Sequence, residues 1–283
     1  MKKLIVDKKY NNKKLTNFLM DNFTGLSVNT VYKALRKKDI LVNDVRVKDN
    51  VTLFAGDNVT VYITDNYLFK QVNLEIVFED DNIVVVNKPS GIEVVDGDSE
   101  TLTTILEKQI NRSVFPCHRL DRNTSGLVLF AKNENSLNIL LDKFKNKEIN
   151  KFYKCKVYGI PKKDTATLEA YLFKDNKKSK VYIYDTPRTG TVKIITSYKV
   201  LKKDLKQNIS TLEVELHTGK THQIRAHLAH IGHPIIGDGK YGKNEINKKF
   251  NKNTQELFAY KLVFDFKTDA KMLNYLNKKD FEI

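Results

Sequence analysis

One stretch decides how the chain folds: Cys117–Phe130, with the sequence CHRLDRNTSGLVLF. Its first part is a polar loop that places Asp121 between Arg119 and Arg122. Its second part, Leu127–Phe130, is a short apolar run that predicts a buried strand. A charge-dense loop is therefore attached to the edge of a core, an arrangement in which binding and catalytic groups are common. Taken alone, the loop favours a surface ion pair of Asp121 with one of its neighbours, and the rest of the chain reverses that interpretation.

Composition and charge set the class of protein. At 283 residues the chain is long enough for about two domains, and its hydrophobic content of 41% indicates a globular protein. The 49 Lys and Arg residues against 34 Asp and Glu residues give a formal charge of +15. This excess favours a polyanionic partner, since binding to phosphates releases condensed counterions. The competing explanation is compositional, because lysine and asparagine are abundant throughout the chain.

Several classes of protein are not expected. Cys117 and Cys155 form no C-x-x-C pair, so the chain has no zinc or redox signature. The segment Met1–Asp7 lacks the apolar stretch of a signal peptide, and no window is long enough to span a membrane. We therefore expect a reduced, cytoplasmic and monomeric protein without a metal, a cofactor or a membrane partner.

Residues 1–65 are predicted to form a small α+β unit. Ser27 can cap a helix over Val28–Lys37, and the spacing places Val28, Val31 and Leu35 inward. The outer face of this helix is basic, with Lys33, Arg36 and Lys37. The order of motifs in this unit resembles an S4-type RNA-binding domain, in which this helix would meet the RNA backbone. A basic, merely solvated helix face is the alternative.

A linker is predicted at 66–73, and residues 74–283 are predicted to form a second domain. The periodicity predicts strands at Leu74–Phe78, Ile83–Val86, Phe152–Val157 and Thr211–Leu216. It predicts helices at Leu102–Ile110, capped by Thr101, and at Glu134–Phe144. The lysine-rich interval 160–195 has only weak strand signals and turns.

A second polar cluster runs from Leu216 to Pro234 and contains five of the six histidines. His227 and His230 can share a helical face, but no acidic residue completes an H-E-x-x-H site. We therefore favour helix-surface and cap histidines over zinc ligands. Thr221 is predicted to cap the helix here, with Arg225 one turn further in.

Together the motifs carry a resemblance. The segments His118–Leu127 and Gly219–Leu228 resemble the RluA-type family of pseudouridine synthases. Three further landmarks match in the same order, namely Val86–Gly91, Lys151–Lys154 and Gly237–Gly242. The resemblance covers roughly residues 74–266. It implies an α+β catalytic domain with a mixed, largely antiparallel sheet, crossed by an active cleft that receives Asp121 from one side and Arg225 from the other.

The resemblance also implies roles for individual residues. Asp121 would be the catalytic aspartate, and Arg225 would pair with it and orient it. Tyr153 would stack under the target base and assist proton removal, while Arg122 would enter the space that the flipped uridine leaves. The other residues that we predict to contact RNA are Arg119, Lys88, His118 and Lys220, with Lys33, Arg36 and Lys37 in the N-terminal unit.

The implied chemistry agrees with the residues present. Pseudouridine formation is a redox-neutral isomerisation that needs no hydride carrier, phosphate donor or metal. A carboxylate suits the oxocarbenium character that develops when a glycosidic bond breaks. We therefore predict an RNA pseudouridine synthase that acts on large-subunit ribosomal RNA, with transfer RNA as the second choice. The alternatives are a non-catalytic RNA-binding or ribosome assembly factor of the same fold, and a hydrolase that uses Asp121 as a nucleophile.

Overall fold

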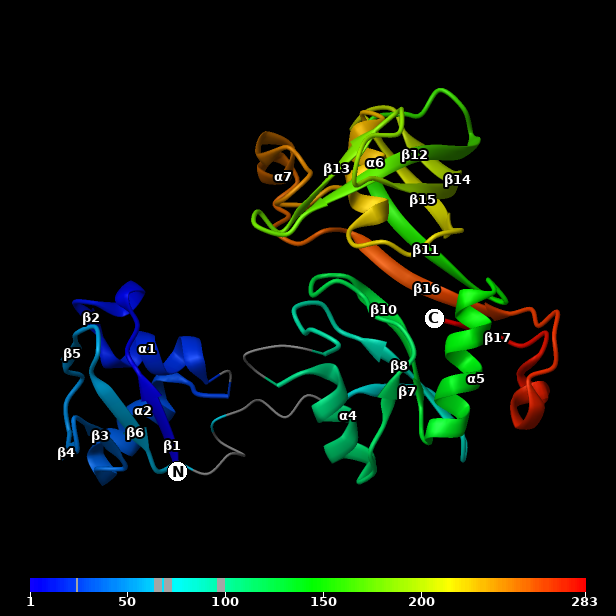
Figure 1. Cartoon of the computed structure of the whole chain (residues 1–283). Helices are drawn as coiled ribbons and strands as arrows, with labels where there is room; N and C mark the ends of the chain where they lie inside the picture. Colours follow the sequence, from blue (N-terminus) through cyan, green and yellow to red (C-terminus); the bar gives the residue numbers. More distant parts are fainter. Residues whose placement is uncertain (24, 64–67, 69–72, 96–99) are drawn as a thin grey trace. The chain divides into compact units, whose positions relative to one another are not determined.

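The computed structural model describes residues 1–23, 25–63, 68, 73–95 and 100–283. The chain divides into two compact units, Met1–Asn73 and Leu74–Ile283, each of which is described by itself (Figure 1). Except for Leu68 and Asn73, the linker predicted at 66–73 lies outside the described residues. No helix in the described ranges is long and apolar enough to cross a membrane.

The first unit packs two helices against short antiparallel strands. The helices are α1 (Leu15–Asn22) and α2 (Val28–Lys37), with a 3₁₀ turn at Lys8–Tyr10. The strands are β1 (Lys2–Ile5), β2 (Lys13–Lys14), β3 (Ile40–Val42), β4 (Val45–Arg46), β5 (Thr52–Leu53) and β6 (Asn58–Val61). Four of these strands form one sheet in the order β1-β6-β3-β4, and β2 pairs with β5.

Helix α2 begins and ends where the sequence predicted. The Ser27 hydroxyl accepts a hydrogen bond from the Thr30 N–H at 3.2 Å, which satisfies one of the free donors of the first turn. Val31 and Leu35 are buried, but the prediction for Val28 is wrong, since it is 48% exposed in the first turn of the helix. The three predicted basic residues of this helix are all exposed. The S4-type assignment of this unit stays a prediction.

The second unit is built on one large sheet. Its strands are β7 (Glu75–Glu79), β8 (Ile83–Lys88), β9 (Phe115–Pro116), β10 (Ser125–Ala131), β11 (Ile149–Tyr158), β12 (Thr165–Asp175), β13 (Lys180–Tyr184), β14 (Val192–Asp204), β15 (Ile209–Leu216), β16 (Leu257–Phe264) and β17 (Asp280–Glu282). Its helices are α4 (Leu102–Ile110), α5 (Glu134–Lys145), α6 (Gln223–His230) and α7 (Asn244–Lys249), with a 3₁₀ helix at Lys271–Leu276.

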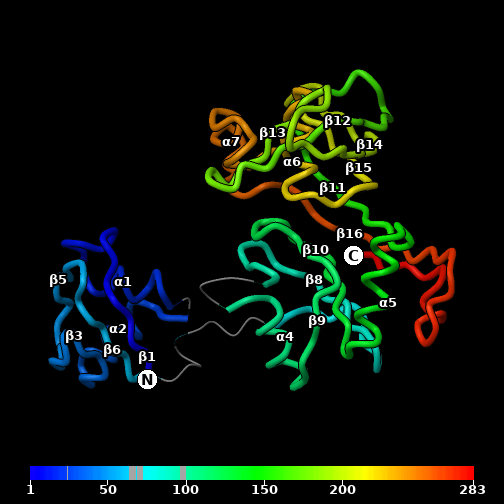
Figure 2. Tube along the Cα trace, viewed as in Figure 1, coloured from blue at the N-terminus to red at the C-terminus, as the bar shows by residue number. Residues whose placement is uncertain are grey.

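The strand order β13-β12-β14-β15-β11-β16-β10-β8-β7 confirms the predicted fold class. Strands β10 and β16 pair in parallel, and the other neighbours in this order pair antiparallel, so the sheet is mixed and largely antiparallel. Figures 1 and 2 show β11 and β16 joining a half that holds β7, β8 and β10 to a half that holds β12–β15. The middle of the sheet is therefore the place where distant parts of the chain meet.

The apolar run of the deciding stretch lies in the core, as predicted. Leu127 and Leu129 of β10 are fully buried and pack in one cluster with Leu140 of α5 and Leu262 of β16. Gly126 begins this run at a φ of +114°, and a Cβ built there would lie 2.2 Å from the carbonyl oxygen of Ala259. Only glycine allows β10 to approach β16 this closely, so this residue fixes where the polar loop leaves the sheet.

The interval 160–195 differs from the prediction. It contains β12, β13 and the start of β14, which form long antiparallel pairings. Strand β12 alternates exposed and partly buried residues, because one of its faces is solvated. Thr165, Thr167 and Glu169 hold exposed positions of this strand, and lysines lie in the loops on either side of it, which explains why the sequence signal was weak.

Candidate active site

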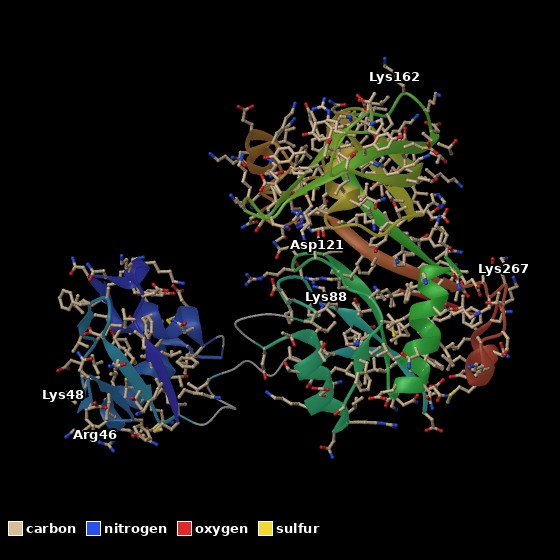
Figure 3. All side chains as sticks on the ribbon, in the orientation of Figure 1. Arg46, Lys48, Lys88, Asp121, Lys162 and Lys267 are labelled. Atoms are coloured by element: carbon tan, nitrogen blue, oxygen red, sulfur yellow. The ribbon has the colours of Figure 1, made fainter. Side chains whose placement is uncertain are left out.

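The loop that carries Asp121 joins β9 to β10, and hydrogen bonds to the end of β8 and to the turn after it hold this loop in place. The Arg122 carbonyl accepts hydrogen bonds from the Gly91 N–H at 2.9 Å and from the Lys88 Nζ at 2.9 Å. The Ser90 hydroxyl donates to the Asn123 carbonyl at 3.0 Å. These bonds fix the loop backbone that carries Asp121. Figure 3 labels the Asp121 and Lys88 side chains in this part of the domain.

Lys88 corrects one prediction. We expected this residue to contact RNA, but its side chain is fully buried. Its Nζ donates to the carbonyls of Pro89, Ile92 and Arg122 at 2.7–2.9 Å. Burial lowers the pKa of Lys88 to about 8, against the charges of Asp121 and Glu93, which raise it. Lys88 therefore supports the loop of Asp121 from inside the domain, and none of its three donors is left for RNA.

Arg225 of α6 joins Asp121 to a second carboxylate. Its Nη1 donates to the Asp121 Oδ2 at 2.8 Å, while its Nε and Nη2 donate to the two Asp238 oxygens at 2.7 and 3.0 Å. This fork fixes the plane of the guanidinium. Burial acts to lower the pKa of Arg225, but the hydrogen bonds and charge of Asp238, and then those of Asp121, raise it overall.

Asp238 was missed as a site residue, although its segment Gly237–Gly242 was one of the quoted landmarks. Its side chain is fully buried. Burial acts to raise the pKa of Asp238, but the bonds from Arg225 and from the backbone N–H groups of Tyr241 and Lys240 lower it overall. The carboxylate therefore holds the arginine from behind while Asp121, whose side chain is 26% exposed, faces the open side.

Tyr153 lies on β11, next to an irregularity in the pairing of β11 with β16 between Phe152 and Tyr153. The ring is 5% exposed and lines the same cavity as Asp121. Burial, and secondly the charge of Asp121, raise the pKa of Tyr153 well above its ordinary value. The Tyr153 hydroxyl is therefore protonated at neutral pH. The ring of the same residue is part of the cavity wall.

Asp121, Tyr153 and Arg225 line one cavity of about 660 Å³. The volume is within the range of about 300–1,000 Å³ that small-molecule sites occupy, so it can receive a nucleotide. The cationic residues of its wall are Arg119, Arg122, Lys151, Lys174, Lys220, Arg225 and Lys240, and the acidic ones are Glu93 and Asp121. This balance favours an anionic ligand.

Four further residues of this domain were predicted to contact RNA. Arg119, Arg122 and Lys220 line the cavity, and the Nε of Arg122 donates to the Gly91 carbonyl at 3.1 Å. His118 also lines the cavity, but its Nε2 accepts from the Leu129 N–H at 3.1 Å and its Nδ1 is buried. Burial and the charge of Lys151 lower the pKa of His118 to about 3. We predicted that His118 binds RNA, but its Nε2 is bonded to Leu129 and its Nδ1 is buried, and the neutral ring supports β10.

The start of α6 also differs from the prediction. His222, at a φ of 52°, is the N-terminal cap residue in place of Thr221. The Gln223 side-chain oxygen accepts instead from the Lys220 N–H at 3.1 Å, while its amide donates to the Thr196 hydroxyl at 2.9 Å. These bonds tie the helix start to β14 and so hold Arg225 in place.

Comparison with known proteins adds the following. Residues 82–230 match a family model described as RNA pseudouridylate synthase. A protein of Mycoplasma capricolum named uncharacterized RNA pseudouridine synthase is 34% identical over 99% of this chain and 96% of its own length. A Rickettsia bellii protein named ribosomal large subunit pseudouridine synthase C is 31% identical over 94% of this chain and 96% of its own length. The structure of human RNA pseudouridylate synthase domain containing 1 shares the fold, with a TM-score of 0.61 at 24% identity over 71% of this chain and 82% of that one.

Proposed function

The chain belongs to the RNA pseudouridylate synthase family, and from this premise we propose that it isomerises uridines of large-subunit ribosomal RNA with Asp121 as the catalytic carboxylate. The observation that carries the proposal is the pairing of Asp121 with Arg225, 104 residues away, in a cationic cavity beside Tyr153. Relatives in Rickettsia bellii and Vibrio cholerae that are named ribosomal large subunit pseudouridine synthases support the choice of RNA. Transfer RNA is the alternative substrate.

The arrangement supports a simple sequence of steps. The target uridine leaves its stack, which costs roughly a few kcal/mol and is easiest in single-stranded RNA. Its ring lies against Tyr153, while Asp121, fixed by Arg225, faces the sugar. The carboxylate stabilises the positive charge that develops as the bond between C1′ and N1 breaks. The uracil turns and C5 bonds to C1′. C5 then loses its proton and N1 gains one, so the reaction consumes no second reactant.

The proposal is tested by mapping pseudouridines in cells with and without the protein. Sites that disappear from the large-subunit RNA without the protein, and return when purified protein is added to that RNA, would establish the substrate. Sites confined to transfer RNA would move the proposal to the alternative substrate. Release of free uracil would indicate a hydrolase instead.

We expect Tyr153→Phe and Tyr153→Ala to differ. The ring offers a stacking face, whereas the protonated hydroxyl can take part in moving the C5 proton. Tyr153→Phe should keep the RNA affinity and lower kcat by about 10²–10⁴-fold, the usual contribution of a general acid–base group. Tyr153→Ala should also weaken binding by about 1–3 kcal/mol, the usual loss of one base–aromatic stack. Single-turnover rates and RNA affinities of both variants measure this, and equal affinities would contradict the stacking role.

The exposed basic face of α2 gives a further prediction. If Lys33, Arg36 and Lys37 contact phosphates, replacing all three with glutamine should make the slope of log affinity against log salt shallower by about 2–3, at about 0.7–0.9 per contact. Turnover at saturating RNA should not change, because these residues are outside the cavity. The control neutralises the exposed Lys267, Lys271 and Lys278 near the C-terminus, which changes the net charge equally. An equal loss of slope in both triple variants would refute specific contacts by α2.

A further inference from the structure

Lys151 is a cavity residue to which the proposed reaction gives no role. It lies on β11, two residues before Tyr153, so both side chains leave the same face of the strand. Both line the cavity. Two residues of a strand span roughly 7 Å, which places Lys151 next to the stacking ring without putting it under the same base.

The ammonium group of Lys151 rests on apolar and backbone surroundings. Its Nζ is 4.7 Å from the centre of the Phe144 ring. A Cβ built on Gly219, which also lines the cavity, would lie 3.8 Å from this Nζ. Burial alone lowers the pKa of Lys151 to about 8, and no charged group acts against this shift. The side chain therefore keeps its proton at neutral pH but has lost much of its water.

Two fully buried lysines of this unit are satisfied by the protein. Lys88 donates to three carbonyls, as described above. Lys143 pairs with Glu148 at 2.8 Å and donates to the Thr268 carbonyl and hydroxyl at 2.7 and 2.6 Å. Within the described residues, Lys151 has neither an ion-pair partner nor a hydrogen-bond acceptor. Its donors are left for a ligand, since a partly buried cation without a partner is costly.

The cavity itself does not supply the missing anion. Asp121 is bound to Arg225, and Glu93, the other carboxylate of the wall, does not act on the pKa of Lys151. The ligand of the proposed reaction carries one negative charge per nucleotide. A lysine ammonium is a compact point charge with three donors, which suits a phosphate oxygen.

We propose that Lys151 binds a backbone phosphate of the RNA beside the flipped uridine and so sets the position of that uridine on Tyr153. This assignment rests on the proposed function, because it takes RNA as the ligand. Lys151 acts here as a positioning residue. It differs from the exposed basic residues of the cavity wall because it fixes one phosphate near the reacting base.

The test uses a short RNA fragment that contains a mapped target uridine, with a neutral methylphosphonate placed at each phosphate in turn. For wild-type protein, one position next to the uridine should lower both affinity and kcat/KM by about tenfold, the effect of one charge-assisted hydrogen bond. Lys151→Met should lose about the same factor with unmodified RNA and lose nothing more at that position. It should keep the wild-type response at every other phosphate. Lys151→Arg should restore part of the affinity, which separates a lost contact from a misfolded cavity.

The matched control is Lys154→Met on the same strand. Lys154 leaves the opposite face of β11 and rests on the Tyr260 ring at 3.8 Å. It should respond to the methylphosphonates like wild type. If Lys151→Met has wild-type affinity, or if its losses add to the methylphosphonate effect at every position, the proposal is overturned. RNA affinity tests the phosphate contact, and product formation tests the activity. A wild-type protein that forms no product but shows the same non-additive affinity losses would refute only the proposed function.

Discussion

Asp121→Asn should abolish pseudouridine formation, with a fall in turnover of about 10⁴-fold or more, which is typical when the central group of a catalytic set is removed. Asparagine has the same shape, and its carbonyl oxygen can still accept from Arg225. The substitution therefore removes the negative charge that faces the sugar and leaves the geometry in place. RNA affinity should stay within a few-fold of wild type. Single-turnover assays on the mapped RNA, together with binding measurements, give both quantities.

The chain offers a matched control for this variant. Glu93 is the other carboxylate in the cavity wall, and Glu93→Gln changes the cavity charge by the same amount. It should keep turnover within about tenfold, because it is not held by Arg225. A similar loss of turnover in both variants would mean that the rate depends on the total charge of the cavity and that Asp121 has no specific role. Full activity of Asp121→Asn would return the protein to the class of RNA-binding factors.

Asp238→Asn should cause the largest loss of stability, about 3–5 kcal/mol, because it leaves the buried guanidinium of Arg225 without its bidentate partner. It should also lower activity, since the orientation of Arg225 determines that of Asp121. The native pKa of Asp238 is lowered, so its stabilising contribution is present above the ordinary aspartate pKa of about 4 and is lost on acidification. Urea unfolding combined with hydrogen exchange of peptides from residues 74–283 measures the effect on this unit.

Asp185→Asn serves as the comparison for stability. Asp185 also bonds to a basic side chain, His230, at 2.8 Å, but its own side chain is 85% exposed. The change should stay within about 0.5 kcal/mol, as usual for a surface substitution. If the two variants have the same free energy of unfolding, Asp238 does not stabilise the buried guanidinium of Arg225.

Much of the fold could be predicted from local signals. The caps at Ser27 and Thr101 are local hydrogen bonds, and both occur where the sequence placed them. The buried strand after the polar loop of Cys117–Phe130 was predicted correctly, because an apolar run next to a glycine is a short-range pattern. Local signals failed at β12 and β13, because the solvated face of β12 carries polar residues and lysines in the adjoining loops lower the apolar content of this interval.

The candidate site was predicted as a set of residues, and the tertiary structure decided what each member contacts. The sequence determined that Asp121 sits in a polar loop beside a core strand and that its motifs resemble one enzyme family. It did not determine that Lys88 is fully buried, that Asp238 holds Arg225, or that the Lys151 ammonium group has no acceptor among the described residues. Burial and pairing depend on which distant elements pack together, and here β8, β11, α6 and the turn at Asp238 converge across one sheet. The free energy of a charge changes with the water and the opposite charges around it, and these are set only when the chain is folded.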